Sequence, residues 1–292
     1  MIHSLQSEFL HVEVNSKGAE LNSLFSTKTK TEYLWQGDPS VWGKRAPVLF
    51  PIVGRLKDGQ YTYNGITYAM PAHGFASSAD FIVEEATHNS LTLSIEDTAA
   101  TMAMYPFRFN FKVIFTLNEN ALDVVYMVTN KTDGPIYFSF GSHEGYRCPR
   151  HEGEVFEDYY LEFDRDAAYA SHIVSPEGLI TRSVYPVIEN GRRLPLSYKY
   201  FDNDSLVFMD IVSKKIALCS HKSPSRLEIE YSGAPNLVVW TKNGAPYVCI
   251  EPWSGMGDFE NADGQLVNKQ GIVSLEKGGI YSCKHTISIY EN

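Results

Sequence analysis

The chain has 292 residues, a formal net charge of −10 and 43% apolar residues. This length allows one large β domain or two ordinary ones, with enough apolar residues to bury a substantial core. The acidic balance argues against a nucleic-acid partner, because phosphate backbones require a basic surface. No apolar run reaches membrane-spanning length and no secretory signal is visible, so we expect a cytoplasmic protein without a membrane partner.

The cysteine spacing points to reduced thiols. The four cysteines are far apart and form no CxxC pair, namely Cys148, Cys219, Cys249 and Cys283. Such spacing fits neither a zinc knuckle nor a disulfide framework, so we expect mostly buried thiols in a reducing compartment.

Alternation of apolar and polar residues predicts β-strands along most of the chain. The clearest strand patterns lie within residues 9–26, 91–97, 109–140, 227–241 and 285–290. A glycine turn divides the first of these segments, and Asn118-Glu119-Asn120 predicts a hairpin turn in the third. Residues 97–105 predict one helical turn or a short helix that ends at Pro106.

Many strands at short spacing predict an all-β protein with a large antiparallel sandwich or barrel. No internal repeat or Gly/Ser linker divides the chain, so residues 1–292 are predicted to form one domain. The segment 149–200 is the least regular. It is predicted to contribute either long loops around a site or surface decoration.

Two N-terminal stretches combine charge with turn residues. Arg45 and Arg55 bracket an apolar run and Lys57 follows it, a pattern that by itself favours a buried strand with charged ends. His73 precedes Gly74, and a glycine there permits a tight turn or close approach to a ligand. A single histidine in a loop is more often a surface residue.

His143 follows the strand-like PIYFSF and the small residues Gly141 and Ser142. This order would present an imidazole at the end of a sheet strand. An HExxH motif would require histidine at position 147, where the chain has Arg147, so no metal site is predicted.

Glu251 ends the apolar run YVCI and precedes Pro252 and Trp253. A carboxylate at the inner end of a buried strand is where a raised pKa is readily produced. Trp253 could stack on the apolar face of a sugar ring. The competing interpretation, a structural Glu–Arg pair, has about equal weight.

A histidine and a glutamate at the ends of two strands favour general acid–base chemistry. The sequence has no GxSxG, P-loop or GxGxxG pattern. Acyl transfer, nucleotide hydrolysis and nicotinamide chemistry are therefore not first choices.

The stretches RAPVLFPIVGRL, AHGF, GSHEGY and EPWSGMGD, with the tail LVNKQGIVSLEKGG, together resemble the aldose 1-epimerase (galactose mutarotase-like) superfamily in its LacX-type branch. The resemblance covers most of the chain in order. It implies a large antiparallel β-sandwich, called a supersandwich. It also implies interconversion of the α and β anomers of an aldose by ring opening and closing, without a metal or organic cofactor.

The resemblance also implies roles for individual residues. His143 resembles the general acid that protonates the ring oxygen, and Glu251 the base that takes the proton of the anomeric hydroxyl. His73 resembles the second histidine, which hydrogen-bonds the substrate. Arg55 resembles an arginine that contacts sugar hydroxyls, and Asp204 matches the substrate-binding aspartate, with Asp202 as the alternative.

Three positions depart from the family pattern. Galactose mutarotases commonly have His-Gly-Gly and His-Pro, where this chain has His73-Gly74-Phe75 and His143-Glu144. Many members of the branch have arginine where this chain has Ser77. A missing arginine removes a bidentate donor for hydroxyls or phosphate. These differences bear on the substrate more than on the reaction type.

Several functions remain open at this point. The first is a mutarotase for a free hexose, galactose or glucose, and the second is one for a hexose phosphate, with Arg45, Arg55 and Lys57 as cationic contacts. A non-catalytic carbohydrate sensor would not need an acid–base pair. A glycoside hydrolase needs two carboxylates, and only Glu251 is well placed. The expected partner is a small sugar, and the protein is expected to be a monomer or homodimer.

Overall fold

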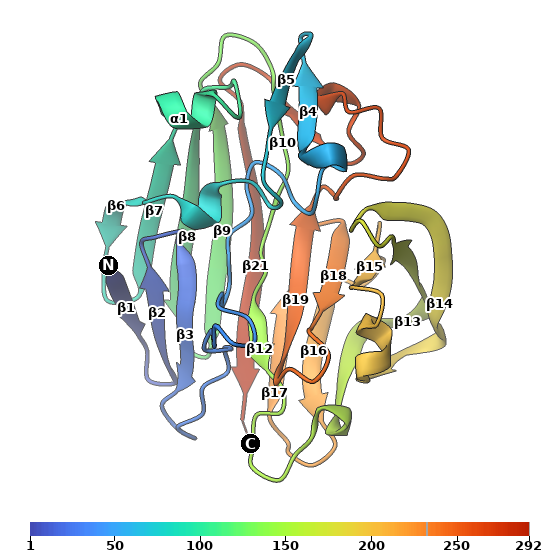
Figure 1. The fold of residues 1–292 in the computed structure, drawn as a ribbon. Helices are drawn as coiled ribbons and strands as arrows, with labels where there is room; N and C mark the ends of the chain where they lie inside the picture. Colours follow the sequence, from blue (N-terminus) through green and yellow to red (C-terminus); the bar gives the residue numbers. More distant parts are fainter. Residues whose placement is uncertain (232, 292) are drawn as a thin grey trace.

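The computed structural model describes residues 1–231 and 233–291. Antiparallel β-strands make up most of this part of the chain, and they form a large curved sheet with smaller sheets packed on it (Figure 1). The predicted all-β supersandwich is therefore confirmed. No helix within the described ranges is long and apolar enough to cross a membrane.

The main sheet contains fourteen of the described strands. Twelve of them follow one another in the order β11-β19-β18-β15-β13-β16-β17-β21-β9-β8-β7-β6, while β12 pairs with β19 and β14 with β13. Their bounds are β6 Ile82–Ala86, β7 Ser90–Glu96, β8 Phe109–Asn118, β9 Ala121–Asn130, β11 Phe140–Gly141, β12 Gly145–Arg147, β13 Tyr159–Val174, β14 Ile180–Pro195, β15 Leu206–Phe208, β16 Lys215–Ser220, β17 Arg226–Glu230, β18 Asn236–Trp240, β19 Tyr247–Ser254 and β21 Ile280–Tyr290.

The smaller elements cover the main sheet. A three-stranded sheet lies in front of β7–β9 in Figure 1, and its apolar side chains join the same core cluster. Its strands are β1 Ile2–Gln6, β2 Leu10–Asn15 and β3 Glu20–Ser26. The remaining elements are β4 Gln60–Tyr63, β5 Ile66–Ala69, β10 Ile136–Phe138, β20 Val273–Leu275, the helix α1 Ala99–Met102 and short 3₁₀ turns at Lys57–Gly59, Ala76–Ser78, Phe156–Asp158, Tyr198–Phe201 and Leu266–Asn268.

Two local predictions are confirmed, although the helix ends at Met102 and not at Pro106. The hairpin between β8 and β9 turns at Glu119, which has a φ of 50°. The short helix α1 begins after Thr98, whose side chain accepts a hydrogen bond from the backbone N–H of Thr101. Such an N-cap satisfies a backbone donor that the first helical turn leaves free.

The segment 149–200 is more regular than the predicted loops, although its turn does reach a pocket, as one of the two alternatives expected. This segment is dominated by a long hairpin of β13 and β14, each of 16 residues. The ladder contains several register shifts, including one between Glu162 and Ala167. Each shift moves side chains between the two faces, so the alternation that identifies a strand is lost from the sequence.

The apolar run between Arg45 and Arg55 also differs from its prediction. Residues 46–53 are buried, but they lie outside the named strands. They join the fold through two isolated bridges, Leu49 with Gly141 and Phe50 with Gly74. This segment therefore links the chain before His143 to the chain after His73.

The turn at His73 and Gly74 depends on glycine. Both residues have positive φ, 65° and 73°. A Cβ atom on Gly74 would lie 2.2 Å from the carbonyl oxygen of Phe50. That contact is backbone and cannot be relieved by rotating a side chain, so this position requires glycine for both conformation and space.

We expect Gly74→Ala to destabilise the protein far more than Gly65→Ala. Gly65 has a φ of 78° and no heavy atom within 4 Å of an added Cβ, so only the conformational cost of about 1 kcal/mol applies there. At Gly74 the overlap adds at least about 2 kcal/mol. Urea denaturation of both variants measures the difference, and equal midpoints would contradict the steric argument.

Candidate active site

A pocket of about 390 Å³ opens beside the short strands β11 and β12. Its volume is within the range of small-molecule sites. The lining combines aromatic, aliphatic and ionisable side chains, namely Trp42, Lys44, Pro47, Leu49, Gly54, Arg55, Ala72, His73, Ser77, His143, Val174, Gly178, Ile180, Asp204, Ser205, Val207, Val238, Trp240, Glu251, Trp253 and Gly257.

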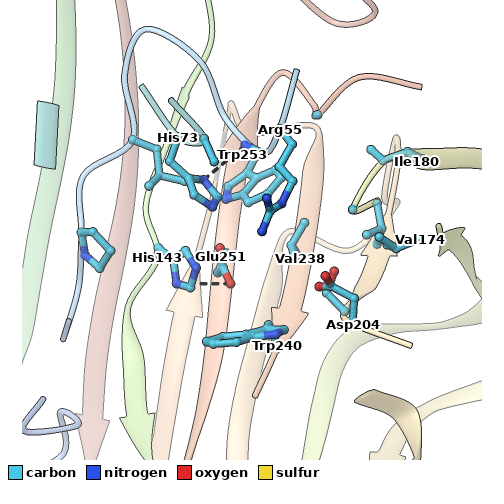
Figure 2. A pocket seen from close by; sticks show the side chains of 18 of the residues that line it. Arg55, His73, His143, Val174, Ile180, Asp204, Val238, Trp240, Glu251 and Trp253 are labelled. Atoms are coloured by element: carbon cyan, nitrogen blue, oxygen red, sulfur yellow. Dashed lines mark hydrogen bonds and ion pairs between the residues drawn. The ribbon is translucent and has the colours of Figure 1, made fainter. Parts of the chain in front are cut away.

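His143 and Glu251 are cross-strand neighbours. Gly141 pairs with Trp253 and Gly145 pairs with Cys249, so the antiparallel register places His143 opposite Glu251. Side chains opposite each other in this arrangement lie on the same face of the sheet. His143 Nδ1 is 3.4 Å from Glu251 Oε1, as Figure 2 shows. His143 itself lies between β11 and β12, and strand pairing on both sides of it holds it opposite Glu251.

The same register extends the row across the sheet. Glu251 pairs with Val238 on β18, and Val238 pairs with Val207 on β15. The row His143, Glu251, Val238 and Val207 is called the pocket floor below. Trp253 and Trp240 lie above and below this floor in Figure 2. An apolar floor with one acid–base pair at its edge would contact the apolar face of a ring and a polar atom beside it.

Burial favours the neutral forms of both groups in the pair. Glu251 is 1% exposed, and its pKa is raised well above the usual range, first by burial and then by the nearby Glu144 and Asp204 carboxyls. The pKa of His143 is lowered well below its usual value, mainly by burial and also by His73. Trp42 stacks on the His143 ring at 5.1 Å between centroids, which excludes water from one face.

His73 is held as a neutral hydrogen-bond donor. Its Nδ1 accepts a hydrogen bond from the backbone N–H of Gly54, 3.2 Å away. Burial, with a smaller effect from Arg55, lowers the His73 pKa to about 4. Because Nδ1 accepts, the neutral ring carries its proton on Nε2. The ring centroid lies 5.4 Å from that of His143.

Arg55 and Asp204 provide charge away from His143. Figure 2 shows Asp204 across the pocket from His143. Burial raises the Asp204 pKa, while the Arg55 guanidinium opposes that rise. Gly178 packs closely on Arg55, since an added Cβ would lie 2.7 Å from the Arg55 Cδ. Asp202, the alternative to Asp204, is exposed and accepts a hydrogen bond from Asn243.

A buried ion pair behind Arg55 fixes the loop that carries it. Lys269 Nζ lies 2.6 Å from Asp258 Oδ1, and the two side chains are 3% and 6% exposed. Asp258 also accepts a hydrogen bond from the backbone N–H of Lys57, and its own N–H donates to the Arg55 carbonyl. Removing one partner of such a pair leaves a buried charge, so the pair holds these loops together.

A second buried pair lies behind Glu251. His285 Nε2 is 3.1 Å from Glu144 Oε1, with both side chains at most 4% exposed. The Glu144 carbonyl accepts a hydrogen bond from the N–H of Ile250, the neighbour of Glu251. Glu144 stands where galactose mutarotases commonly have the proline of His-Pro. It places a second carboxyl group near that of Glu251.

The structure brings most of the predicted site residues together. His73, His143, Glu251, Arg55, Asp204 and Trp253 all line the pocket. Arg45 does not, because its Nη1 donates to the carbonyl of Asn22, 3.0 Å away. Lys57 lines a separate depression. The neighbouring Lys44 lies in the pocket in their place.

Sequence reasoning missed several lining residues. Trp42 and Trp240 pack on His143, with Trp240 edge-on at 5.7 Å. Trp240 ends a predicted strand, and a large aromatic at that end was the only signal available. Val174 and Ile180, at the end of the β13–β14 hairpin, could not be found because the hairpin itself was not predicted.

Comparisons with known proteins agree with this geometry. The family model for aldose 1-epimerase matches residues 1–288. The chain is 35% identical over 297 aligned residues to the chromosomal protein LacX of Lactococcus lactis subsp. lactis, covering 99% of this chain and 94% of that protein.

Solved structures are similar over the whole chain. A galactose mutarotase related enzyme from Lactobacillus acidophilus superposes with a TM-score of 0.96 at 33% identity, covering 100% of this chain and 98% of that one. A galactose mutarotase-like protein from Lactobacillus casei gives 0.93 at 26% identity, with 99% and 100% covered. On the full-length family match and these relatives, the chain belongs to the aldose 1-epimerase family.

Proposed function

We propose that the protein is a cofactor-independent aldose 1-epimerase that interconverts the α and β anomers of a free hexose. The observation that carries this proposal is the buried pair of His143 Nδ1 and Glu251 Oε1, 3.4 Å apart on the pocket floor. Ring opening needs one proton delivered to the ring oxygen and one removed from the anomeric hydroxyl. A histidine and a carboxylate side by side provide both functions.

The pair carries a single proton throughout the cycle. In ring opening, protonated His143 gives its proton to the ring oxygen while the Glu251 carboxylate takes the proton of the anomeric hydroxyl. The open aldehyde then faces neutral His143 and protonated Glu251. Rotation about the C1–C2 bond exposes the other face of the aldehyde, and reclosure reverses both transfers. The cycle leaves the protein unchanged, so no cofactor is needed.

Burial favours neutral His143 together with protonated Glu251, and this is the arrangement that closes the ring. The ionised arrangement, which opens the ring, differs only in the position of one proton. Because both arrangements contain the same number of protons, their ratio does not depend on pH. His143 Nδ1 and Glu251 Oε1 are 3.4 Å apart without a hydrogen bond between them, so the bound sugar carries the proton from one residue to the other.

The other lining residues orient the sugar. The Nε2–H of His73 is free to donate to a sugar oxygen, since its Nδ1 accepts from Gly54. Arg55 and Asp204 supply a donor and an acceptor for hydroxyl groups on the far side. Trp253 and Trp240 provide flat apolar surfaces of the kind on which sugar rings stack.

We expect Glu251→Gln and His143→Asn each to slow mutarotation by about 10²- to 10⁴-fold, because each removes one of the two proton-transfer groups. Polarimetry of freshly dissolved α-D-galactose and α-D-glucose in a weakly catalytic buffer measures the rate. Sugar binding is followed separately by the fluorescence of the pocket tryptophans.

The matched control is His88→Asn, which changes an exposed histidine. Wild-type activity in Glu251→Gln would exclude the proposed acid–base role. Tryptophan quenching by sugars without any acceleration by the wild type would instead identify a non-catalytic carbohydrate sensor.

The pH profile of kcat/KM should show a plateau. At low pH, activity falls when His143, whose pKa is lowered, becomes protonated while Glu251 still holds its proton. At high pH, activity falls when Glu251, whose pKa is raised, loses its proton while His143 is neutral.

Glu144→Gln removes one cause of the raised Glu251 pKa, so the alkaline limb should move to lower pH while the acid limb stays. Glu85→Gln, at an exposed strand position, should move neither. An unmoved alkaline limb in Glu144→Gln would contradict this coupling.

A hexose phosphate is the second candidate substrate, because Lys44 and Arg55 both line the pocket. The Asp204 carboxyl near Arg55 opposes an added anion, so we expect a higher kcat/KM for the free hexose than for its 6-phosphate. Exchange NMR measures both. A higher kcat/KM for the 6-phosphate, which Lys44→Gln lowers at least about tenfold, would establish the hexose phosphate as the substrate.

A further inference from the structure

Cys249 lies directly beside the His143–Glu251 pair. It precedes Glu251 by two residues on β19, and side chains two apart in a strand lie on the same face. Its thiol is free and fully buried. One ligand atom from each of His143, Cys249 and Glu251 lies within 4.8 Å of the other two. Three groups that can bind a metal therefore converge at the edge of the pocket floor.

Two of these groups already have the spacing of metal ligands. Two ligands about 2.0 Å from a tetrahedral zinc ion are about 3.3 Å apart. His143 Nδ1 and Glu251 Oε1 are 3.4 Å apart. The thiol must approach by about 1 Å for a Zn–S bond of about 2.3 Å, a distance within reach of a change in its χ1 angle.

The polar atoms of the site are not committed to other hydrogen bonds. His143 Nδ1 and both carboxyl oxygens of Glu251 are buried and have no hydrogen-bond partner among the described residues. A metal ion would therefore displace no hydrogen bond. The pocket lies in front of His143 and Glu251, so a fourth ligand, water or a sugar hydroxyl, can complete a tetrahedron.

The ligand set selects the class of ion. An imidazole, a thiolate and one carboxylate suit borderline-soft ions such as Zn²⁺, Co²⁺ and Cd²⁺, whereas Mg²⁺ and Ca²⁺ prefer oxygen ligands. A thiolate and a carboxylate together also neutralise the charge of a divalent ion at this buried position.

We propose that His143, Cys249 and Glu251 form an inhibitory binding site for Zn²⁺ and related divalent ions. The bound ion occupies the two groups that exchange protons with the sugar, so it blocks mutarotation. Binding displaces the thiol proton of Cys249 and the single proton shared by His143 and Glu251, and both pass to solvent. Affinity therefore rises with pH. The inhibition rests on the proposed function, whereas the binding does not.

Titration of the metal-free protein with Co²⁺ tests the binding without any assay of activity. We expect thiolate-to-cobalt charge-transfer absorption together with the intense visible bands of a tetrahedral ion. Both absorption features should be absent from the Cys249→Ser and Cys249→Ala variants. The two substitutions differ in polarity, so a folding defect in one of them does not decide the result. Cys219→Ser is the matched control, because Cys219 is also buried and free but lies on β16.

Polarimetry with added Zn²⁺ tests the inhibition. We expect inhibition of the wild type and of Cys219→Ser that a chelator reverses, and at least about tenfold weaker inhibition of Cys249→Ser, since the thiolate ligand is lost. Absence of the cobalt charge-transfer band, or equal inhibition of wild type and Cys249→Ser, would overturn the site. If no sugar is a substrate, the Co²⁺ titration still decides the binding.

Discussion

The burial of a carboxyl group directly opposite an imidazole is the constraint on which the rest of the site depends. His143 and Glu251 face each other because the ladder from Gly141–Trp253 to Gly145–Cys249 leaves no other register. Their separation is therefore set by backbone spacing, which is stiffer than a pair of side chains on loops. Burial then makes charge on either residue costly, so the surroundings favour neutral His143 with protonated Glu251.

Two further buried pairs hold the segments around His143 and Glu251. Asp258 and Lys269 fix the loop of Arg55, and Glu144 and His285 lie behind β19. A buried charge without its partner would be strongly destabilising, so the Asp258–Lys269 pair ties its two segments together. Two hydrogen bonds also connect the loops of Gly54 and His73: the His73 N–H donates to the Gly54 carbonyl, and the Gly54 N–H donates to His73 Nδ1.

The sequence carries the local part of this architecture and little of the long-range part. Alternation identified the regular strands, and the order of small residues before His143 marked the end of one strand. That His143 faces Glu251 depends on strand pairing, which no local pattern encodes. The β13–β14 hairpin was missed because its bulges disrupt the alternation. Arg45 was predicted as a cationic contact, but the path of the loop decides which side chain enters the pocket, and there it is Lys44.

The β13–β14 hairpin brings Val174, Gly178 and Ile180 to the pocket without contributing to the His143–Glu251 pair. Its connecting turn can vary in composition, except at Gly178 beside Arg55, while the strands around His143 and Glu251 stay intact. Under the proposed function, a change in this turn would alter the selectivity among sugars without displacing the His143–Glu251 pair. Grafting this turn from one member of the family to another offers a route to redirect selectivity without redesigning the reaction.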